Sequence, residues 1–197
     1  LFGQIDIRMK SYIAEFLELE PEEAFKVQKR YFREYGTTLR GLMDRHEINP
    51  REFLDHVHDI DIDVVPPNPA LDRALANLPG RKIIFTNADV RHAERVMNRL
   101  GVEHHFEAIF DIVACDYVPK PEPVVYQALV NRFDIDPEKT VMVEDMARNL
   151  KPAADIGMTT VWVRTDTDWG QESSEGDHVH HVVDDLSSWL TDISAIP

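Results

Sequence analysis

From about residue 69 onward, short apolar runs alternate with segments of helical periodicity, and this alternation constrains the fold more than any other feature. The apolar runs predict strands over residues 82–86, 110–115, 140–144 and 159–163, and helices are expected over 69–78, 89–100, 122–133 and 147–156. Short buried strands that alternate with helices are typical of a parallel sheet with helical crossovers. The pattern therefore predicts an α/β fold with a Rossmann-like parallel sheet at its core.

The first part of the chain carries only helix signals. Apolar residues recur at helical spacing between residues 5 and 16, and Asn49 before a proline marks a later helix start. The composition then shifts to aspartate and proline over residues 58–69, which suits a linker. We therefore predict two domains, a helical unit over residues 1–64 and an α/β core over residues 65–197.

Composition limits the partners that this chain can have. A formal net charge of −15 argues against nucleic acid, whose phosphate backbone needs a basic face. No apolar run approaches the roughly 20 residues that span a bilayer, so no membrane partner is expected. Cys115 is the single cysteine and lies in an apolar run, which predicts a packed side chain, no disulfide framework and a cytoplasmic location. No pattern indicates an oligomeric state.

Polar side chains follow the predicted strands and one loop between them. Thr86 and Asn87 end one apolar run, Glu144 and Asp145 end another, and Lys120 lies in a proline-bounded loop. Ligands of open α/β sheets bind at the carboxyl ends of the strands, so these groups can converge. A hydroxyl beside a helix start and an ammonium group suit a phosphate, and paired carboxylates favour Mg²⁺. Each signal alone also fits a helix cap or a surface loop, and only the ordered set is specific.

The ordered set resembles motifs II, III and IV of the haloacid dehalogenase-like hydrolases. The matching segments are Phe85-Thr86-Asn87, Lys120-Pro121-Glu122-Pro123 and Glu144-Asp145. Three further segments are similar to the pyrimidine 5′-nucleotidase subgroup, namely residues 35–42, 58–61 and 144–149. The resemblance covers the chain to about residue 163. It implies that the N-terminal helices form a C1-type cap, which this family inserts between motifs I and II.

The resemblance also implies roles for the residues of the predicted site. Thr86 and the backbone of Asn87 would bind phosphoryl oxygens, and Lys120 would neutralise the nucleophile and the transferring phosphoryl group. Asp145 would ligate Mg²⁺, with Glu144 beside it directly or through water. The implied activity is that of a Mg²⁺-dependent phosphomonoesterase that acts through an aspartyl-phosphate on a small phosphorylated metabolite, with a pyrimidine nucleoside 5′-monophosphate as the expected substrate.

Two further polar residues belong to this prediction. Asn149 follows Asp145 by one helical turn, so it can face the same site and orient the groups around the metal. Arg40 lies in the cap segment, where its guanidinium could pair with a nucleotide phosphate or base. The alternative for Arg40 is a structural ion pair on the surface or in the core of the cap.

One motif of the family has no counterpart in the sequence. Motif I is Asp-x-Asp at the end of the first strand; its first aspartate attacks phosphorus and its second acts as general acid and base. Residues 59–61 and 166–168 match the Asp-x-Asp pattern. They lie in the linker and in a polar loop, however, and no apolar strand precedes them. We therefore expect the nucleophile and its strand to precede Leu1.

Two alternatives remain at this level. The first is a non-catalytic binding or scaffold protein that has lost motif I. The second is a metal-free 2-haloacid dehalogenase, which is disfavoured because Glu144 and Asp145 would repel the carboxylate of the substrate.

Overall fold

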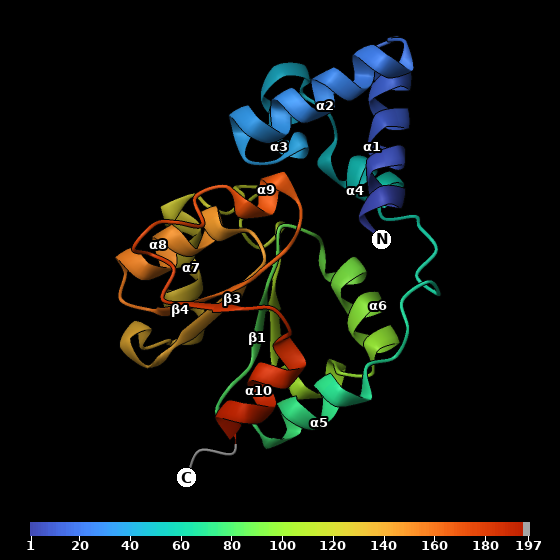
Figure 1. Ribbon diagram of the computed structural model, residues 1–197. Helices are drawn as coiled ribbons and strands as arrows, with labels where there is room; N and C mark the ends of the chain where they lie inside the picture. Colours follow the sequence, from blue (N-terminus) through green and yellow to red (C-terminus); the bar gives the residue numbers. More distant parts are fainter. Residues whose placement is uncertain (195–197) are drawn as a thin grey trace. The chain divides into compact units, whose positions relative to one another are not determined.

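The chain forms two compact units, each with its own parallel sheet. The computed structural model describes residues 1–194 (Figure 1). Unit 1 comprises residues 1–68 and 82–119, and unit 2 comprises residues 69–81 and the chain from residue 120 onward. The predicted α/β class with parallel strands is confirmed. The predicted domain boundary near residue 64 stays a prediction.

Unit 1 combines four N-terminal helices with a two-stranded sheet. Its elements are α1 (Phe2–Phe16), α2 (Pro21–Tyr35), α3 (Thr38–His46), α4 (Pro50–Val57), β1 (Ile83–Phe85), α6 (Val90–Leu100), the 3-10 turn η1 (Glu103–His105) and β2 (Ala108–Phe110). β1 and β2 pair in parallel, with Ile84 opposite Ile109. This sheet carries the segment with Thr86 at the end of β1.

Local signals explain the boundaries of the N-terminal helices. Gly36 ends α2 with a φ of 80°, a conformation that glycine adopts without steric cost. Asn49 is the N-cap of α4, because its side-chain oxygen accepts the N–H of Arg51 at 3.0 Å. The helices share a core that includes Ile13, Leu42 and Phe53, all of which are buried.

The predicted strand over residues 110–115 is wrong, because β2 ends at Phe110 and the chain then turns. The cause is Asp111, a buried residue whose carboxylate accepts the N–H of Ala114 at 2.8 Å and so folds the chain back on itself. Cys115 is buried in this turn, as expected for a packed side chain. Ile112 packs into the core of the N-terminal helices, so the turn joins the sheet of unit 1 to them.

Unit 2 is built around a three-stranded parallel sheet. Its elements are α5 (Pro69–Asn77), α7 (Pro123–Phe133), η2 (Pro137–Lys139), β3 (Val141–Glu144), η3 (Ala147–Leu150), α8 (Lys151–Asp155), β4 (Thr159–Val163), α9 (Asp168–Gln171), β5 (His181–Val183) and α10 (Leu186–Ser194). The strand order is β3-β4-β5, with Val143 opposite Val161. Glu144 is the last residue of β3, so the Glu144-Asp145 pair lies at the carboxyl end of this strand.

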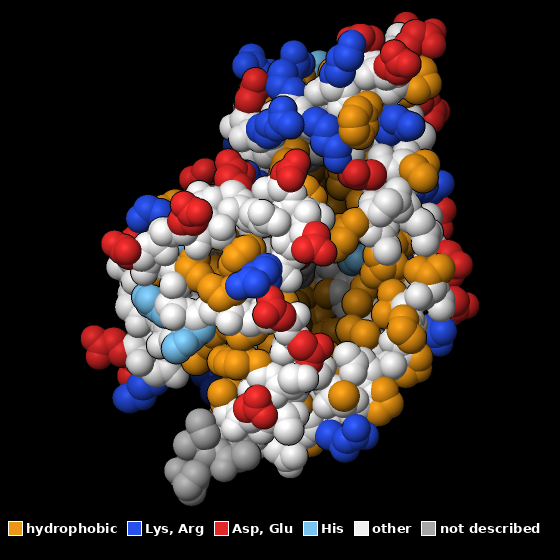
Figure 2. Space-filling view, viewed as in Figure 1, with side chains coloured by type: hydrophobic (Ala, Val, Ile, Leu, Met, Phe, Trp, Pro, Cys, Tyr) orange, Lys and Arg blue, Asp and Glu red, His pale blue; other side chains and the backbone are white. Residues whose placement is uncertain are grey.

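None of the helices within residues 1–194 is long and apolar enough to cross a bilayer. Charged side chains occur on every part of the face seen in Figure 2, and Lys and Arg gather over α2 and α3.

Gly41 provides a test of the packing between α2 and α3. A Cβ atom at Gly41 would lie 2.5 Å from Cβ of Tyr31, which is buried and has little room to move. Gly41→Ala should therefore lower the free energy of unfolding by about 1–3 kcal/mol, the usual cost of overpacking. Urea unfolding at constant m value measures this change.

The control is Gly3→Ala, because nothing lies within 4 Å of a Cβ atom at Gly3 in α1. This variant should be more stable than the parent by up to about 1 kcal/mol, since alanine is the better helix former. Equal stabilities of the two variants would contradict the close packing at Gly41.

Candidate functional site

Thr86 lies in a tight turn between β1 and α6. Its backbone N–H donates to the carbonyl of Phe110 at 3.0 Å, which continues the parallel ladder by one residue. Its side-chain oxygen accepts the N–H of Ala88 at 3.0 Å. The carbonyl of Ala88 in turn accepts the N–H of Ile112 at 3.1 Å. The turn that holds Thr86 and Asn87 is therefore fixed from within and by the end of β2.

Two carboxylates occupy the start of α6. Asp89 is the N-cap and accepts the N–H of His92 at 2.8 Å, while Asp111 accepts the N–H of Val90 at 3.0 Å. Protein carboxylates thus satisfy two amides that a bound anion would otherwise contact. A phosphate at this position would depend on the turn around Thr86 more than on the helix terminus.

A buried ion pair of unit 2 joins Lys120 to Glu144. Nζ of Lys120 lies 2.7 Å from Oε2 of Glu144, and the two side chains are only 6% and 9% exposed. The other oxygen, Oε1, accepts Nδ2 of Asn149 at 2.9 Å and the N–H of Met146 at 3.4 Å. Glu144 is therefore held by donors on both oxygens, and it sets the position of the lysine.

Asp145 adds a second carboxylate to this buried cluster. Burial, followed by the neighbouring charge of Glu144, raises the pKa of Asp145 to about 6 against the opposing effect of Lys120. Oδ1 of Asn149 is also buried, with no hydrogen-bond partner among the described residues. Two carboxylates beside one ammonium leave a net negative charge, so Glu144 and Asp145 are suited to hold a cation.

Two aromatic residues that no sequence pattern indicated position this cluster. The Tyr126 hydroxyl donates to the carbonyl of Asn149, and Nε1 of Trp162 donates to the carbonyl of Asp145 at 3.0 Å. Burial, followed by the charge of Glu144, raises the pKa of Tyr126, so its hydroxyl keeps its proton. Both residues lie in apolar runs whose polar atoms gave no signal in the sequence.

Arg40 forms an ion pair within α3. Its Nη2 lies 3.0 Å from Oδ1 of Asp44, and its Nε donates to Oδ2 at 3.1 Å. Both side chains are about one third exposed. The guanidinium therefore has a local partner one turn away, which is the structural alternative considered for this residue, and its role toward a substrate stays a prediction.

The predicted site residues are divided between the two units. Unit 2 brings together Lys120, Glu144 and Asp145, which were predicted to hold the metal and the transferring group, and Asn149, which was predicted to orient the groups around the metal. Unit 1 holds Thr86, Asn87 and Arg40. Their assignment to one site stays a prediction.

Comparison with known proteins identifies the relatives of this chain. Residues 4–157 match the family described as haloacid dehalogenase-like hydrolase. A yeast protein named Phosphate metabolism protein 8, from Saccharomyces cerevisiae, is 24% identical over 98% of this chain and 66% of its own length. N-acetylmuramic acid 6-phosphate phosphatase from Pseudomonas aeruginosa is 28% identical over 76% of this chain and 71% of its own length. The chain thus spans just under two thirds of the yeast relative.

Solved structures support the same fold. L-2-haloacid dehalogenase from Xanthobacter autotrophicus aligns over 99% of this chain and 93% of its own, with a TM-score of 0.61 and 14% identity. At this identity the likeness concerns the fold alone.

The raised pKa of Asp145 predicts a pH-dependent stability. Its folded-state pKa of about 6 exceeds the ordinary value of 3.8, so the folded protein binds this proton more tightly than the unfolded chain. The stability that this group contributes is present below about pH 4 and is lost as the pH rises through about 6. Asp145→Asn should therefore be more stable than the parent at pH 7, and the difference should shrink as the pH falls to about 4.

Thermal unfolding between pH 4 and 7.5, with a chelator present, measures this difference. Asp155→Asn is the matched control, because Asp155 forms an exposed pair with Lys151 on the surface of the same unit. A stability difference for Asp145→Asn that does not change with pH would contradict the prediction.

Proposed function

Because the chain belongs to the haloacid dehalogenase-like hydrolase family, we propose that it hydrolyses phosphate monoesters of small metabolites with Mg²⁺. The observation that carries the proposal is the buried cluster of Lys120, Glu144 and Asp145, with one ammonium and two carboxylates. The phosphatase name of the Pseudomonas relative agrees with this activity. A substrate carboxylate would be repelled by the same two carboxylates, which disfavours dehalogenation.

Each group in the proposed site has a defined task. Lys120 would stabilise the negative charge that spreads over the phosphoryl oxygens in the transition state, while Thr86 and Asn87 bind these oxygens. Glu144 holds the lysine in place through the 2.7 Å contact. Asp145 and Glu144 would hold Mg²⁺, which when bound supplies charge neutralisation for the phosphoryl group.

The covalent step needs a nucleophilic carboxylate, and none of the residues given a role above supplies it. In the proposed reaction an aspartate oxygen attacks phosphorus, the bond from phosphorus to the ester oxygen breaks, and the leaving alkoxide takes a proton from the second aspartate of motif I, which acts as the general acid. Water then hydrolyses the aspartyl-phosphate. We propose that this aspartate comes from a motif I strand outside residues 1–197.

The cap helices are the proposed source of specificity. Residues similar to the pyrimidine 5′-nucleotidase subgroup occur in α3, and Lys and Arg gather over α2 and α3 on the face seen in Figure 2. A planar guanidinium can pair with a phosphate or with a pyrimidine carbonyl. The proposed substrate is therefore a pyrimidine nucleoside 5′-monophosphate, with Arg40 as the residue that contacts it.

The activity is tested with Lys120→Met in the full-length protein, on a generic aryl phosphate. The variant is similar in length but neutral, so kcat should fall by about 10²-fold or more, the scale seen when one stabilising group is removed. Activity of the parent should be lost with a chelator and restored by Mg²⁺. A rise in KM with an unchanged kcat would show that Lys120 only assists binding.

Two controls make this test specific. Lys151→Met removes an exposed lysine that pairs with Asp155 and should leave kcat unchanged. The double variant Lys120→Met with Glu144→Gln removes both charges of the buried pair, so comparing its stability with that of Lys120→Met shows how much an unpaired Glu144 disturbs the fold. An inactive, folded parent protein would favour the alternative of a non-catalytic binding protein.

Arg40→Ala tests the proposed specificity. Its kcat/KM for a pyrimidine nucleoside 5′-monophosphate should fall by about tenfold or more, the scale of one lost charged hydrogen bond, while that for a small aryl phosphate changes less. Arg45→Ala on the same helix is the control, because Arg45 contacts the Tyr35 hydroxyl instead. Equal losses on both substrates would make Arg40 structural, and a preference for sugar phosphates would overturn the nucleotide assignment.

A further inference from the structure

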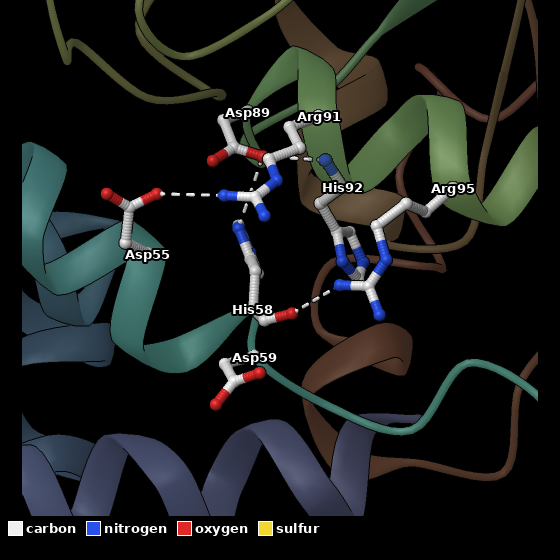
Figure 3. A pocket seen from close by; sticks show the side chains of 7 residues that line it. All are labelled: Asp55, His58, Asp59, Asp89, Arg91, His92 and Arg95. Atoms are coloured by element: carbon white, nitrogen blue, oxygen red, sulfur yellow. Dashed lines mark hydrogen bonds and ion pairs between the residues drawn. The ribbon is translucent and has the colours of Figure 1, made fainter.

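The end of α4 and the start of α6 meet at a small cavity of about 40 Å³ in unit 1 (Figure 3). His58, which caps α4, stacks on His92 with ring centroids 4.3 Å apart and planes inclined by 19°. Nδ1 of His58 lies 3.3 Å from Oδ1 of Asp89, the oxygen that also accepts the N–H of His92. One carboxylate therefore contacts the end of α4 and the first turn of α6 at the same time.

Two arginines on α6 hold the chain that follows α4. Arg95 donates to the carbonyls of His58 and Ile60, both at 2.8 Å. Arg99, one turn later, donates to the carbonyl of Asp63 at 3.0 Å. These bonds fix the backbone around His58, so its ring is presented to α6 in one position.

The other charged groups around the rings come from α1, α4 and α6. Asp55 on α4 lies 3.6 Å from Arg91 on α6, and Asp59 pairs with Arg8 on α1 at 2.8 Å. Asp55 and Asp59 each pair with an arginine, whereas Asp89 contacts the imidazole of His58.

The electrostatics agree with this geometry. Burial, followed by the electrostatic effect of His58, lowers the pKa of His92 to about 4 against the opposing effect of Asp89, so His92 is neutral at pH 7. Burial alone would raise the pKa of Asp89, but its contacts with His58 and with the N–H of His92 lower it overall. An ionised carboxylate therefore lies beside a pair of stacked rings in which the His92 ring is neutral.

We propose that His58 is a positioning residue, which acts through Asp89 to tie the start of α6, and with it the turn of Thr86, to the end of α4. The turn spans residues 86–88 and runs directly into Asp89, while the end of β2 fixes its other side. This role rests on the proposed function, because it concerns the turn that would bind the phosphoryl group. Without His58, the first turn of α6 should open more often, and the turn of Thr86 should lose its fixed position.

Amide hydrogen exchange in the intact chain tests this role. In His58→Leu, exchange at residues 86–92 should accelerate by about tenfold, because local opening becomes more favourable. In His58→Asn, whose side-chain N–H₂ can reach Asp89, exchange should stay within about threefold of the parent. His56→Leu is the matched control. His56 lies in the last turn of α4, and its side chain contacts Ser11 and Tyr12 on α1 instead of α6.

The second readout is the affinity for inorganic phosphate, followed by amide chemical shifts. His58→Leu should weaken it by about fivefold, the lower end of couplings between separate sites. Unchanged exchange in His58→Leu, or an equal acceleration in His56→Leu, would overturn the proposal. A failure of His58→Asn to restore slow exchange would also overturn it. If exchange changes as expected and the parent binds no phosphate, the positioning role holds and the proposed function fails.

Discussion

A buried carboxylate at the carboxyl end of a parallel strand organises each of the two units. In unit 1, Asp111 follows β2 and binds the amides of Val90 and Ala114, so it joins the sheet, the start of α6 and the turn that packs against the N-terminal helices. In unit 2, Glu144 ends β3 and binds Lys120 and Asn149. A buried carboxylate is costly unless donors satisfy it, so these contacts leave the surrounding backbone few alternative arrangements.

The buried carboxylates of the two units have different kinds of partners. Asp111 and Asp89 are paired with backbone amides and an imidazole, and they consume donors that an anion could have used. Glu144 and Asp145 share a single lysine, so that cluster remains short of positive charge. The first arrangement builds a rigid support for a turn, and the second favours the binding of a cation.

The positions of several helices and strands could be predicted from the sequence, because caps and apolar periodicity depend on residues that are close together in the chain. The helix start at Asn49 and the strand before Thr86 follow from a cap residue and from the apolar pattern, and the structure agrees with both. The strand predicted over 110–115 failed, since apolar residues there pack into a turn fixed by Asp111.

Contacts between distant segments could not be predicted in the same way. Tyr126 reaches Asn149 across 23 residues, and Arg95 reaches His58 across 37. Neither residue has a local pattern that distinguishes it from a core tyrosine or a surface arginine. The order of polar groups along the chain indicated Lys120, Glu144 and Asp145, but only the folded structure shows that Glu144 positions the lysine.

The outer strand of the unit 2 sheet has a consequence for how the chain behaves in solution. Among the described residues β3 pairs with β4 alone, and Val141 and Val143 on one of its faces are 52% and 36% exposed. Parallel strands are normally covered on both faces, and an open apolar strand is a template for pairing with other chains. Self-association through β3 should therefore limit the concentration at which residues 1–197 stay monodisperse, and an added strand that covers β3 should act as a solubilising partner.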